Sequence, residues 1–224
     1  MTDSPARNSN ATPTTNRRKL YIWIGAALAV VIVAAVALVW PRDSAPAAVK
    51  PTATFLAEAG QRVAPCGNIG VPVLDAIRDP QGWDVLVVEL SSYQLHHVKR
   101  DGIGSLEPLA SVCLNIADDH LDWHGSAEAY RAAKSTVYAN TLVACVYNKA
   151  DAATEAMVRD ADVADGARAI GFDLGSPGPS DFGIVDGILC DRAFLDDRHH
   201  TAIELTTITE LAARWPGHSA SRQK

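Results

Sequence analysis

Short runs of apolar, mostly β-branched residues recur along the chain, and each ends at a turn or a polar cluster. These runs cover residues 83–90, 111–116, 141–147 and 168–172. Runs of this length without a polar face are typical of strands that are buried on both sides of a parallel sheet. Residues 182–190 instead alternate around Asp186-Gly187, a dipeptide that favours a type I′ turn, so an antiparallel hairpin is predicted there.

Helical patterns separate these strands. Ser126 is a plausible N-cap for a helix reaching to about Asn140, and residues 151–160 and 206–211 also read as helical. Pro72 suits the first turn of a short amphipathic helix over residues 71–77. The order of elements predicts an α/β fold, with a mostly parallel sheet flanked by helices and a late β-hairpin.

The N-terminal region has a different pattern. Residues 1–19 are polar and predict disorder, whereas residues 20–40 contain an uncharged apolar run, Tyr21 to Trp40, long enough to span a bilayer. We therefore predict a single transmembrane helix; a buried core helix and a cleavable signal peptide ending near Ala47 are the alternatives. The positive residues before the run place the N-terminus in the cytoplasm and the rest of the chain outside.

The domain boundaries follow from these changes of pattern. Residues 41–59 begin as a Pro/Ala linker, residues 60–205 form the globular domain, and residues 206–224 form a C-terminal helix remnant and tail. The formal net charge of −6 argues against nucleic acid as a partner and favours a small substrate. The four cysteines form no Cys-x-x-Cys pair, so neither a zinc knuckle nor a thioredoxin-type site is indicated.

Polar clusters follow two of the predicted strands, and they place reactive side chains at one edge of the sheet. Glu89 ends the first strand, and an Asp-rich segment containing His120 follows the second. Since ligands bind at the carboxyl ends of strands in open α/β sheets, we expect Glu89, His120 and Lys134 to lie close together there. Hard carboxylate ligands around His120 suit Mg²⁺; a zinc site made with His124 is the alternative. A solvated Glu89 and a surface Lys134 remain the simpler interpretations of those two residues.

Together the residues resemble the central domain of the Mur ligases, in particular those that join D-glutamate to UDP-N-acetylmuramoyl-L-alanine. The resemblance covers about residues 60–210 and rests on five ordered motifs: Gly67-Asn68-Ile69-Gly70, Glu89-Leu-Ser91-Ser92-Tyr-Gln94-Leu, Leu114-Asn115, Asp119-His120-Leu-Asp122-x-His124-Gly125 and Tyr130-x-Ala-Ala-Lys134.

The resemblance implies an ATP- and Mg²⁺-dependent ligase of peptidoglycan synthesis, cytoplasmic and monomeric. It implies that Glu89 and His120 hold Mg²⁺ and that Lys134 is carbamylated and helps to hold a second Mg²⁺. His120 and Lys134 would thereby be catalytic. Asn68, Ser91 and Gln94 would contact the nucleotide sugar.

The chain also departs from the family pattern. Where the family has a Gly-Lys-Thr-Thr phosphate loop, this chain has Lys50-Pro51-Thr52-Ala-Thr54, and we expect the helix after it to be too short. The family's N-terminal domain is replaced by the apolar segment, and its C-terminal domain does not follow Ser219. We therefore expect an incomplete ligase that is inactive alone, with a non-catalytic membrane-tethered module that binds a nucleotide sugar or acts as a scaffold as the alternative. The resemblance predicts a reaction in the cytoplasm, whereas the charges before the apolar run predict that the domain lies outside the membrane. These two predictions conflict.

Overall fold

The computed structural model describes residues 49–100, 102 and 104–214. The predicted transmembrane segment 20–40, the predicted disordered segment 1–19 and the end of the predicted tail lie outside these ranges. Within the ranges, no helix combines the length and the apolarity that crossing a bilayer requires.

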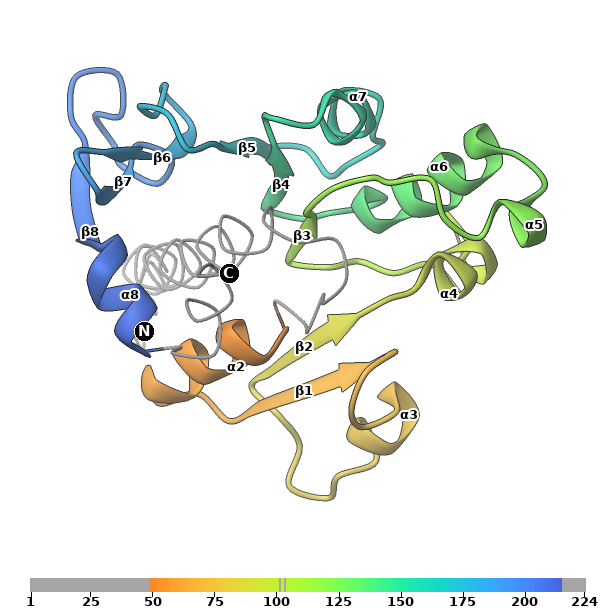
Figure 1. Cartoon of the computed structure of the whole chain (residues 1–224). Helices are drawn as coiled ribbons and strands as arrows, with labels where there is room; N and C mark the ends of the chain where they lie inside the picture. Colours follow the sequence, from red (N-terminus) through yellow and green to blue (C-terminus); the bar gives the residue numbers. More distant parts are fainter. Residues whose placement is uncertain (1–48, 101, 103, 215–224) are drawn as a thin grey trace, which may run out of the picture.

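The strands form two sheets (Figure 1). The smaller sheet pairs β1 with β2 in parallel, and the larger sheet has the order β3-β4-β5-β6-β7-β8, parallel from β3 to β6 and antiparallel from β6 to β8. The strands are β1 (Val63–Gly67), β2 (Val85–Glu89), β3 (Ala110–Cys113), β4 (Ala144–Asn148), β5 (Arg168–Phe172), β6 (Asp181–Val185), β7 (Ile188–Asp191) and β8 (Ile203–Thr207). The predicted α/β class with a mostly parallel sheet is confirmed, but β2 and β3 belong to different sheets among the described residues.

Helices connect the strands and cover them. They are α2 (Val49–Glu58), α3 (Val73–Ala76), α4 (Ser92–His97), α5 (Leu121–His124), α6 (Ala127–Ser135), α7 (Ala152–Arg159) and α8 (Ile208–Arg214), with a 3₁₀ turn η1 (Thr136–Tyr138). Ser126 caps α6 as predicted, since its side chain accepts a hydrogen bond from the Ala129 N–H at 3.1 Å. The helix predicted to reach Asn140 is α6 followed by η1, which ends the helical path two residues earlier.

Helix α2 occupies much of the segment that the sequence analysis assigned to a linker. It has ten residues and packs against β1 and β2, so residues 49–58 belong to the folded domain rather than to a linker. The Lys50-Pro51-Thr52-Ala-Thr54 stretch lies inside this helix, and the Thr54 hydroxyl donates to the Lys50 carbonyl at 2.9 Å. The stretch is itself helical, and the helix continues for only four residues after it, to Glu58.

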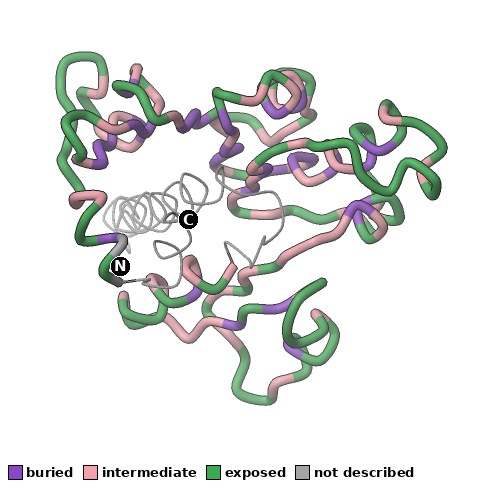
Figure 2. Tube along the Cα trace, in the orientation of Figure 1, coloured by how far each residue is buried: buried purple, intermediate pink, exposed green. Residues whose placement is uncertain are grey.

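The main core lies in the six-stranded sheet, where Figure 2 shows most of the buried positions. Side chains of β4 to β7 meet helix α8 there; the buried members are Ala144, Val146, Ile170, Phe172, Phe182, Leu189, Ala193 and Leu211. The predicted hairpin is confirmed: β6 pairs with β7, and Asp186 and Gly187 have φ values of 50° and 78°, as a type I′ turn requires. Strand β8 extends this antiparallel part and was not predicted.

A buried tyrosine fastens the crossover between β3 and β4. The Tyr138 hydroxyl donates to the Val146 carbonyl at 2.7 Å and accepts from the Cys113 N–H at 3.0 Å. Its side chain has no solvent exposure, and burial holds the pKa of Tyr138 well above its ordinary value. The hydroxyl therefore joins the two strands from the helical layer.

Replacing Tyr138 by phenylalanine leaves both backbone groups without this partner in a buried place. We expect Tyr138→Phe to lower the free energy of unfolding by about 1–3 kcal/mol in urea denaturation. The matched control is Tyr147→Phe, at a half-buried position of β4, which should change it by less. Equal stabilities of the Tyr138→Phe variant and the parent would show that the hydroxyl bridge contributes nothing.

Candidate functional site

The carboxyl ends of β1 and β2 bring two predicted site residues side by side. The backbone N–H of Asn68 donates to the Glu89 carbonyl at 2.8 Å. Gly67, with φ of 117°, lies so close to Glu89 that a β-carbon would meet the Glu89 carbonyl oxygen. Only glycine permits this approach, which explains why a glycine precedes Asn68.

The Glu89 side chain is half-buried, and one of its carboxylate oxygens, Oε2, has no hydrogen-bond partner among the described residues. A buried carboxylate oxygen without a donor is costly unless a cation or a hydrogen-bond donor faces it. The position therefore fits a hard cation such as Mg²⁺, which keeps several water ligands and needs few protein oxygens.

Ser91 and Gln94, the predicted substrate contacts, cap helix α4. The Ser91 hydroxyl accepts from the Gln94 N–H at 3.2 Å, and the Gln94 side-chain oxygen accepts from the Ser91 N–H at 2.8 Å. This reciprocal capping box is visible in the sequence as Ser-x-x-Gln, and the sequence analysis missed it. The capping leaves the Gln94 amide nitrogen, on an exposed side chain, for a ligand.

His120 begins helix α5 in a left-handed conformation, with φ of 52°. Its ring lies 3.3 Å from the Asp119 carboxylate and its centroid 4.8 Å from that of Tyr93 in α4. The structure thus brings His120 against the helix that follows Glu89. Non-glycine residues with positive φ are uncommon and often occur at functional sites.

His124, which the zinc alternative paired with His120, is also held at this edge by several contacts. Its Nε2 lies 3.0 Å from the Ser92 hydroxyl, and its ring packs between Tyr130 and Tyr93 at centroid distances of 5.3 and 5.8 Å. Its Nδ1 is buried without a hydrogen-bond partner among the described residues. Burial, followed by the charges of His96 and His120, lowers the pKa of His124.

The zinc alternative has no support in the described part of the chain. No group of three histidine, cysteine, aspartate or glutamate side chains is placed there to hold a metal. The Nε2 atom of His124 contacts the Ser92 hydroxyl, and the Nε2 atom of His120 contacts the Asp119 carboxylate. A magnesium ion at Glu89 would accordingly depend largely on water ligands.

Lys134 lies near the end of β3, close enough to Cys113 for its charge to act on that thiol. Its positive charge acts on Cys113, although burial still raises the pKa of that thiol to about 11. Its ammonium group forms no hydrogen bond or ion pair with a described residue. The close approach of Glu89, His120 and Lys134 therefore stays a prediction.

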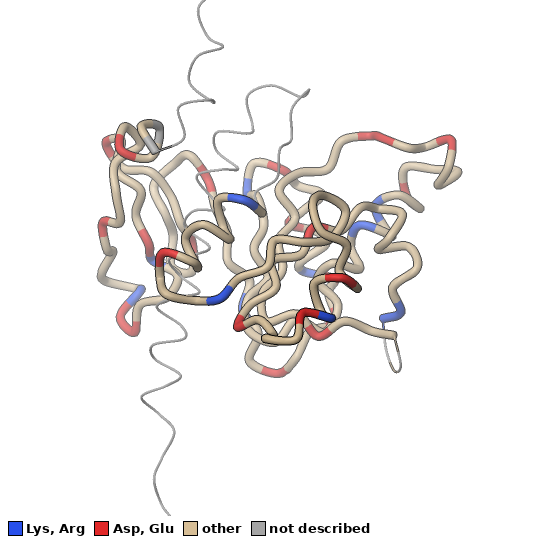
Figure 3. The backbone as a smooth tube through the Cα atoms, turned by 90° about the horizontal axis from the view of Figure 1, so that it is seen from below, with Lys and Arg blue, Asp and Glu red and all other residues tan. Residues whose placement is uncertain are grey.

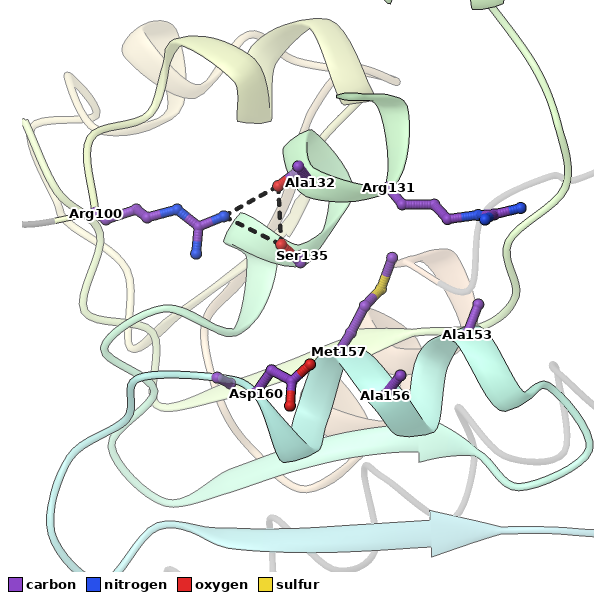
Figure 4. Close-up of a pocket in the computed structure, with 9 residues that line it drawn as sticks. Arg100, Arg131, Ala132, Ser135, Ala153, Ala156, Met157 and Asp160 are labelled. Carbon is purple, nitrogen blue, oxygen red and sulfur yellow. Dashed lines mark hydrogen bonds between the residues drawn. The ribbon is translucent and has the colours of Figure 1, made fainter. Parts of the chain in front are cut away.

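A separate groove runs between α6 and α7 (Figure 4). It encloses about 330 Å³ and has small side chains and Met157 on its walls, with Arg100 bound to the Ala132 carbonyl and the Ser135 hydroxyl at 3.1 Å. None of the six predicted site residues lines it. Figure 3 shows acidic and basic positions interspersed around the described backbone.

Comparison with known proteins shows the family of this chain. A family model described as the Mur ligase middle domain matches residues 49–178, which include all six predicted site residues. The chain belongs to the Mur ligase family. We call the matched range the Mur ligase domain; it begins at Val49, in helix α2.

Similar proteins point to one branch of the family. The chain is 72% identical over 163 residues to the UDP-N-acetylmuramoylalanine–D-glutamate ligase of Leifsonia xyli, covering 73% of this chain and 32% of that protein. It is 52% identical over 173 residues to the same ligase of Streptomyces avermitilis, covering 77% and 36%. The chain thus spans about a third of the length of these relatives.

A solved structure shows the same fold. A UDP-N-acetylmuramoyl-L-alanyl-D-glutamate–2,6-diaminopimelate ligase superposes with a TM-score of 0.51 at 22% identity, covering 68% of this chain and 35% of that one. The resemblance stated from the sequence motifs is confirmed at the level of the family.

The lowered pKa of His124 predicts a pH dependence. We expect its imidazole to titrate below about 6.5 in two-dimensional NMR spectra of the side chain. Because the folded state binds this proton less readily than the unfolded state, the contribution of His124 to stability is complete above the ordinary pKa and decreases as the pH falls. Replacing His96 by alanine should raise the pKa of His124; a value at or above that of a free histidine in the parent would contradict this environment.

Proposed function

We propose that this chain supplies the nucleotide-sugar and metal contacts of the central domain of a D-glutamate-adding Mur ligase. The 72% identity to the Leifsonia xyli ligase carries the proposal, and the family match spans every residue concerned. The reaction of the complete enzyme would join D-glutamate to UDP-N-acetylmuramoyl-L-alanine through an acyl phosphate made from ATP, in the peptidoglycan pathway of the cytoplasm.

The residues at the edge of the β1-β2 sheet suit the sugar-binding role. Asn68 and the Gln94 amide nitrogen are exposed beside Glu89 and can offer hydrogen bonds to carbonyl and hydroxyl groups of the substrate. Ser91 would act mainly by fixing Gln94, because its hydroxyl is engaged in the cap of α4. Asn68 and Gln94 would thus contact the substrate, and Ser91 would position Gln94.

The residues proposed to hold Mg²⁺ are Glu89, through its unpartnered oxygen, and His120. A bound Mg²⁺ would neutralise the phosphate charge that develops during acyl transfer. Lys134 would join the site only if it is carbamylated, which converts its ammonium cation into an anion. Its half-buried position, without an ion pair among the described residues, leaves the amine available for that modification.

The stretch 50–54 supports no ATP clamp. Phosphate loops present backbone N–H groups and a lysine at a helix N-terminus, whereas Pro51 lacks an N–H and Lys50 is already the second residue of α2. We therefore propose that the 224-residue chain binds the nucleotide sugar without ligating it.

The experiment that tests this proposal measures binding and turnover together. Titration of the chain with UDP-N-acetylmuramoyl-L-alanine and Mg²⁺ should shift NMR signals of residues 68 and 89–94, with affinity in the millimolar range typical of an incomplete site. Gln94→Ala should weaken binding roughly tenfold through the loss of its amide contact. Gln81→Ala, at an exposed loop position outside this edge, is the control, and addition of ATP and D-glutamate should release no ADP. Absence of any shift at this edge would refute the binding role, and ADP release above that of Glu89→Ala would refute the lack of ligation.

The second candidate is a non-catalytic module tethered to a membrane, and the uncharged run of residues 21–40 favours it. Both candidates share the nucleotide-sugar site but differ in location. We expect the full-length chain to stay in the membrane pellet after alkaline carbonate extraction, because a bilayer-length apolar segment is not released by loss of ionic contacts. Recovery of the intact chain in the supernatant would exclude the tether.

A further inference from the structure

Trp123 is an exposed member of a cluster of rings built from helices α4, α5 and α6. Its indole lies 4.7 Å from Tyr93, 5.0 Å from His96 and 4.5 Å from His124, measured between centroids. The interplanar angles are 74°, 83° and 78°, so each neighbour meets the indole nearly at a right angle. None of these three rings stacks flat on the indole.

The exposure of Trp123 has no structural reason within this cluster. The residue is 45% exposed although the rings of Tyr93, His96 and His124 contact it. An indole is a large apolar surface, and burying it would have been favourable. A rigid exposed aromatic side chain with polar neighbours is typical of binding surfaces, because little conformational entropy is lost when it contacts a ligand.

The position of Trp123 connects it with the proposed sugar site. Helix α5 has only four residues and begins at the left-handed His120, so its place depends on packing against α4. Tyr93 makes that packing, and it lies between Ser91 and Gln94 in the sequence of α4. The indole therefore flanks the helix that carries the proposed substrate contact.

We propose that Trp123 binds the pyranose ring of the nucleotide sugar by stacking against its carbon face, an inference that rests on the proposed function. The C–H groups of that face carry partial positive charge and suit the negative face of an aromatic ring. A pyranose also carries hydroxyl groups around its rim, and the exposed imidazole of His96 beside the indole can hydrogen-bond them. The uracil ring of the same ligand could also stack on an indole, so UDP alone is the competing occupant that the test has to distinguish.

The test uses the full chain in detergent micelles, labelled with 5-fluorotryptophan and followed by ¹⁹F NMR. The chain has five tryptophans, and Trp123→Phe identifies the signal of Trp123. UDP-N-acetylmuramoyl-L-alanine should shift this signal, whereas UDP alone should leave it in place. The signal of Trp83, held beneath the Arg62 guanidinium at 4.0 Å, is the internal control and should not move.

Variants separate stacking from mere packing of α5. Trp123→Leu should weaken binding of the nucleotide sugar about tenfold, while Trp123→Tyr, which keeps an aromatic face, should retain most of the affinity. An unchanged Trp83 signal in both variants shows that the fold is intact. If Trp123→Leu binds like the parent while Gln94→Ala binds more weakly, the stacking role is wrong and the proposed function stands.

Two other results would overturn the inference in different ways. An equal shift of the Trp123 signal with UDP alone would assign the indole to the nucleobase and contradict the sugar contact. Failure of the parent chain to bind the nucleotide sugar at all would contradict the proposed function itself, and the stacking role would fall with it.

Discussion

The chain leaving β3 is held in place by two side chains of the following β-α unit, and the arrangement of the candidate site depends on this attachment. The Asn148 amide donates to the Leu114 carbonyl at 3.0 Å, and the Asp151 carboxylate accepts from the Ile116 N–H at 2.7 Å. Asp151 also caps α7. The Leu114 carbonyl and the Ile116 N–H lie beyond the end of β3, and these two side chains supply their hydrogen-bond partners. The segment that leads to His120 therefore starts from a fixed position.

From that point the site is assembled by contacts between short helices. Helix α5 packs on α4 through rings, and His124 joins Ser92 of α4 to Tyr130 of α6. These contacts connect the β1-β2 sheet with the six-stranded sheet, since α4 follows β2 and α6 follows β3. Glu89 ends β2 of the smaller sheet, whereas Lys134 lies in α6, so the distance between them is set by helix packing rather than by strand pairing.

Much of the fold could be predicted from residue patterns. The β-branched runs located β2 to β5, and Ser126 and Asp186-Gly187 marked a helix start and a hairpin turn, because local chemistry decides these features. Strand β1 was missed because Pro65 and Gly67 do not read as a strand, yet pairing with β2 imposes one. The split into two sheets could not be read from the sequence, since it depends on long-range pairing.

The candidate site was predictable in its residue types but less so in their roles. Ser91 and Gln94 were predicted to contact the substrate from their motif, whereas in the structure much of their hydrogen bonding caps α4. Trp123 carried no pattern signal, because its importance comes from exposure and from the angles of neighbouring rings. Glu89 was expected to be costly to bury without a cation or donors, and one of its buried oxygens has no hydrogen-bond partner among the described residues; its role as a metal ligand stays a prediction.

The central claim is that this edge of the β1-β2 sheet is a metal and nucleotide-sugar site of the Mur ligase type. Anomalous scattering from crystals soaked in Mn²⁺ and UDP-N-acetylmuramoyl-L-alanine tests it most directly. The account predicts an anomalous peak within coordination distance of the Glu89 carboxylate, on the side facing His120, and none in crystals of the Glu89→Ala variant. A peak located only in the groove between α6 and α7, or no peak near Glu89, would contradict it.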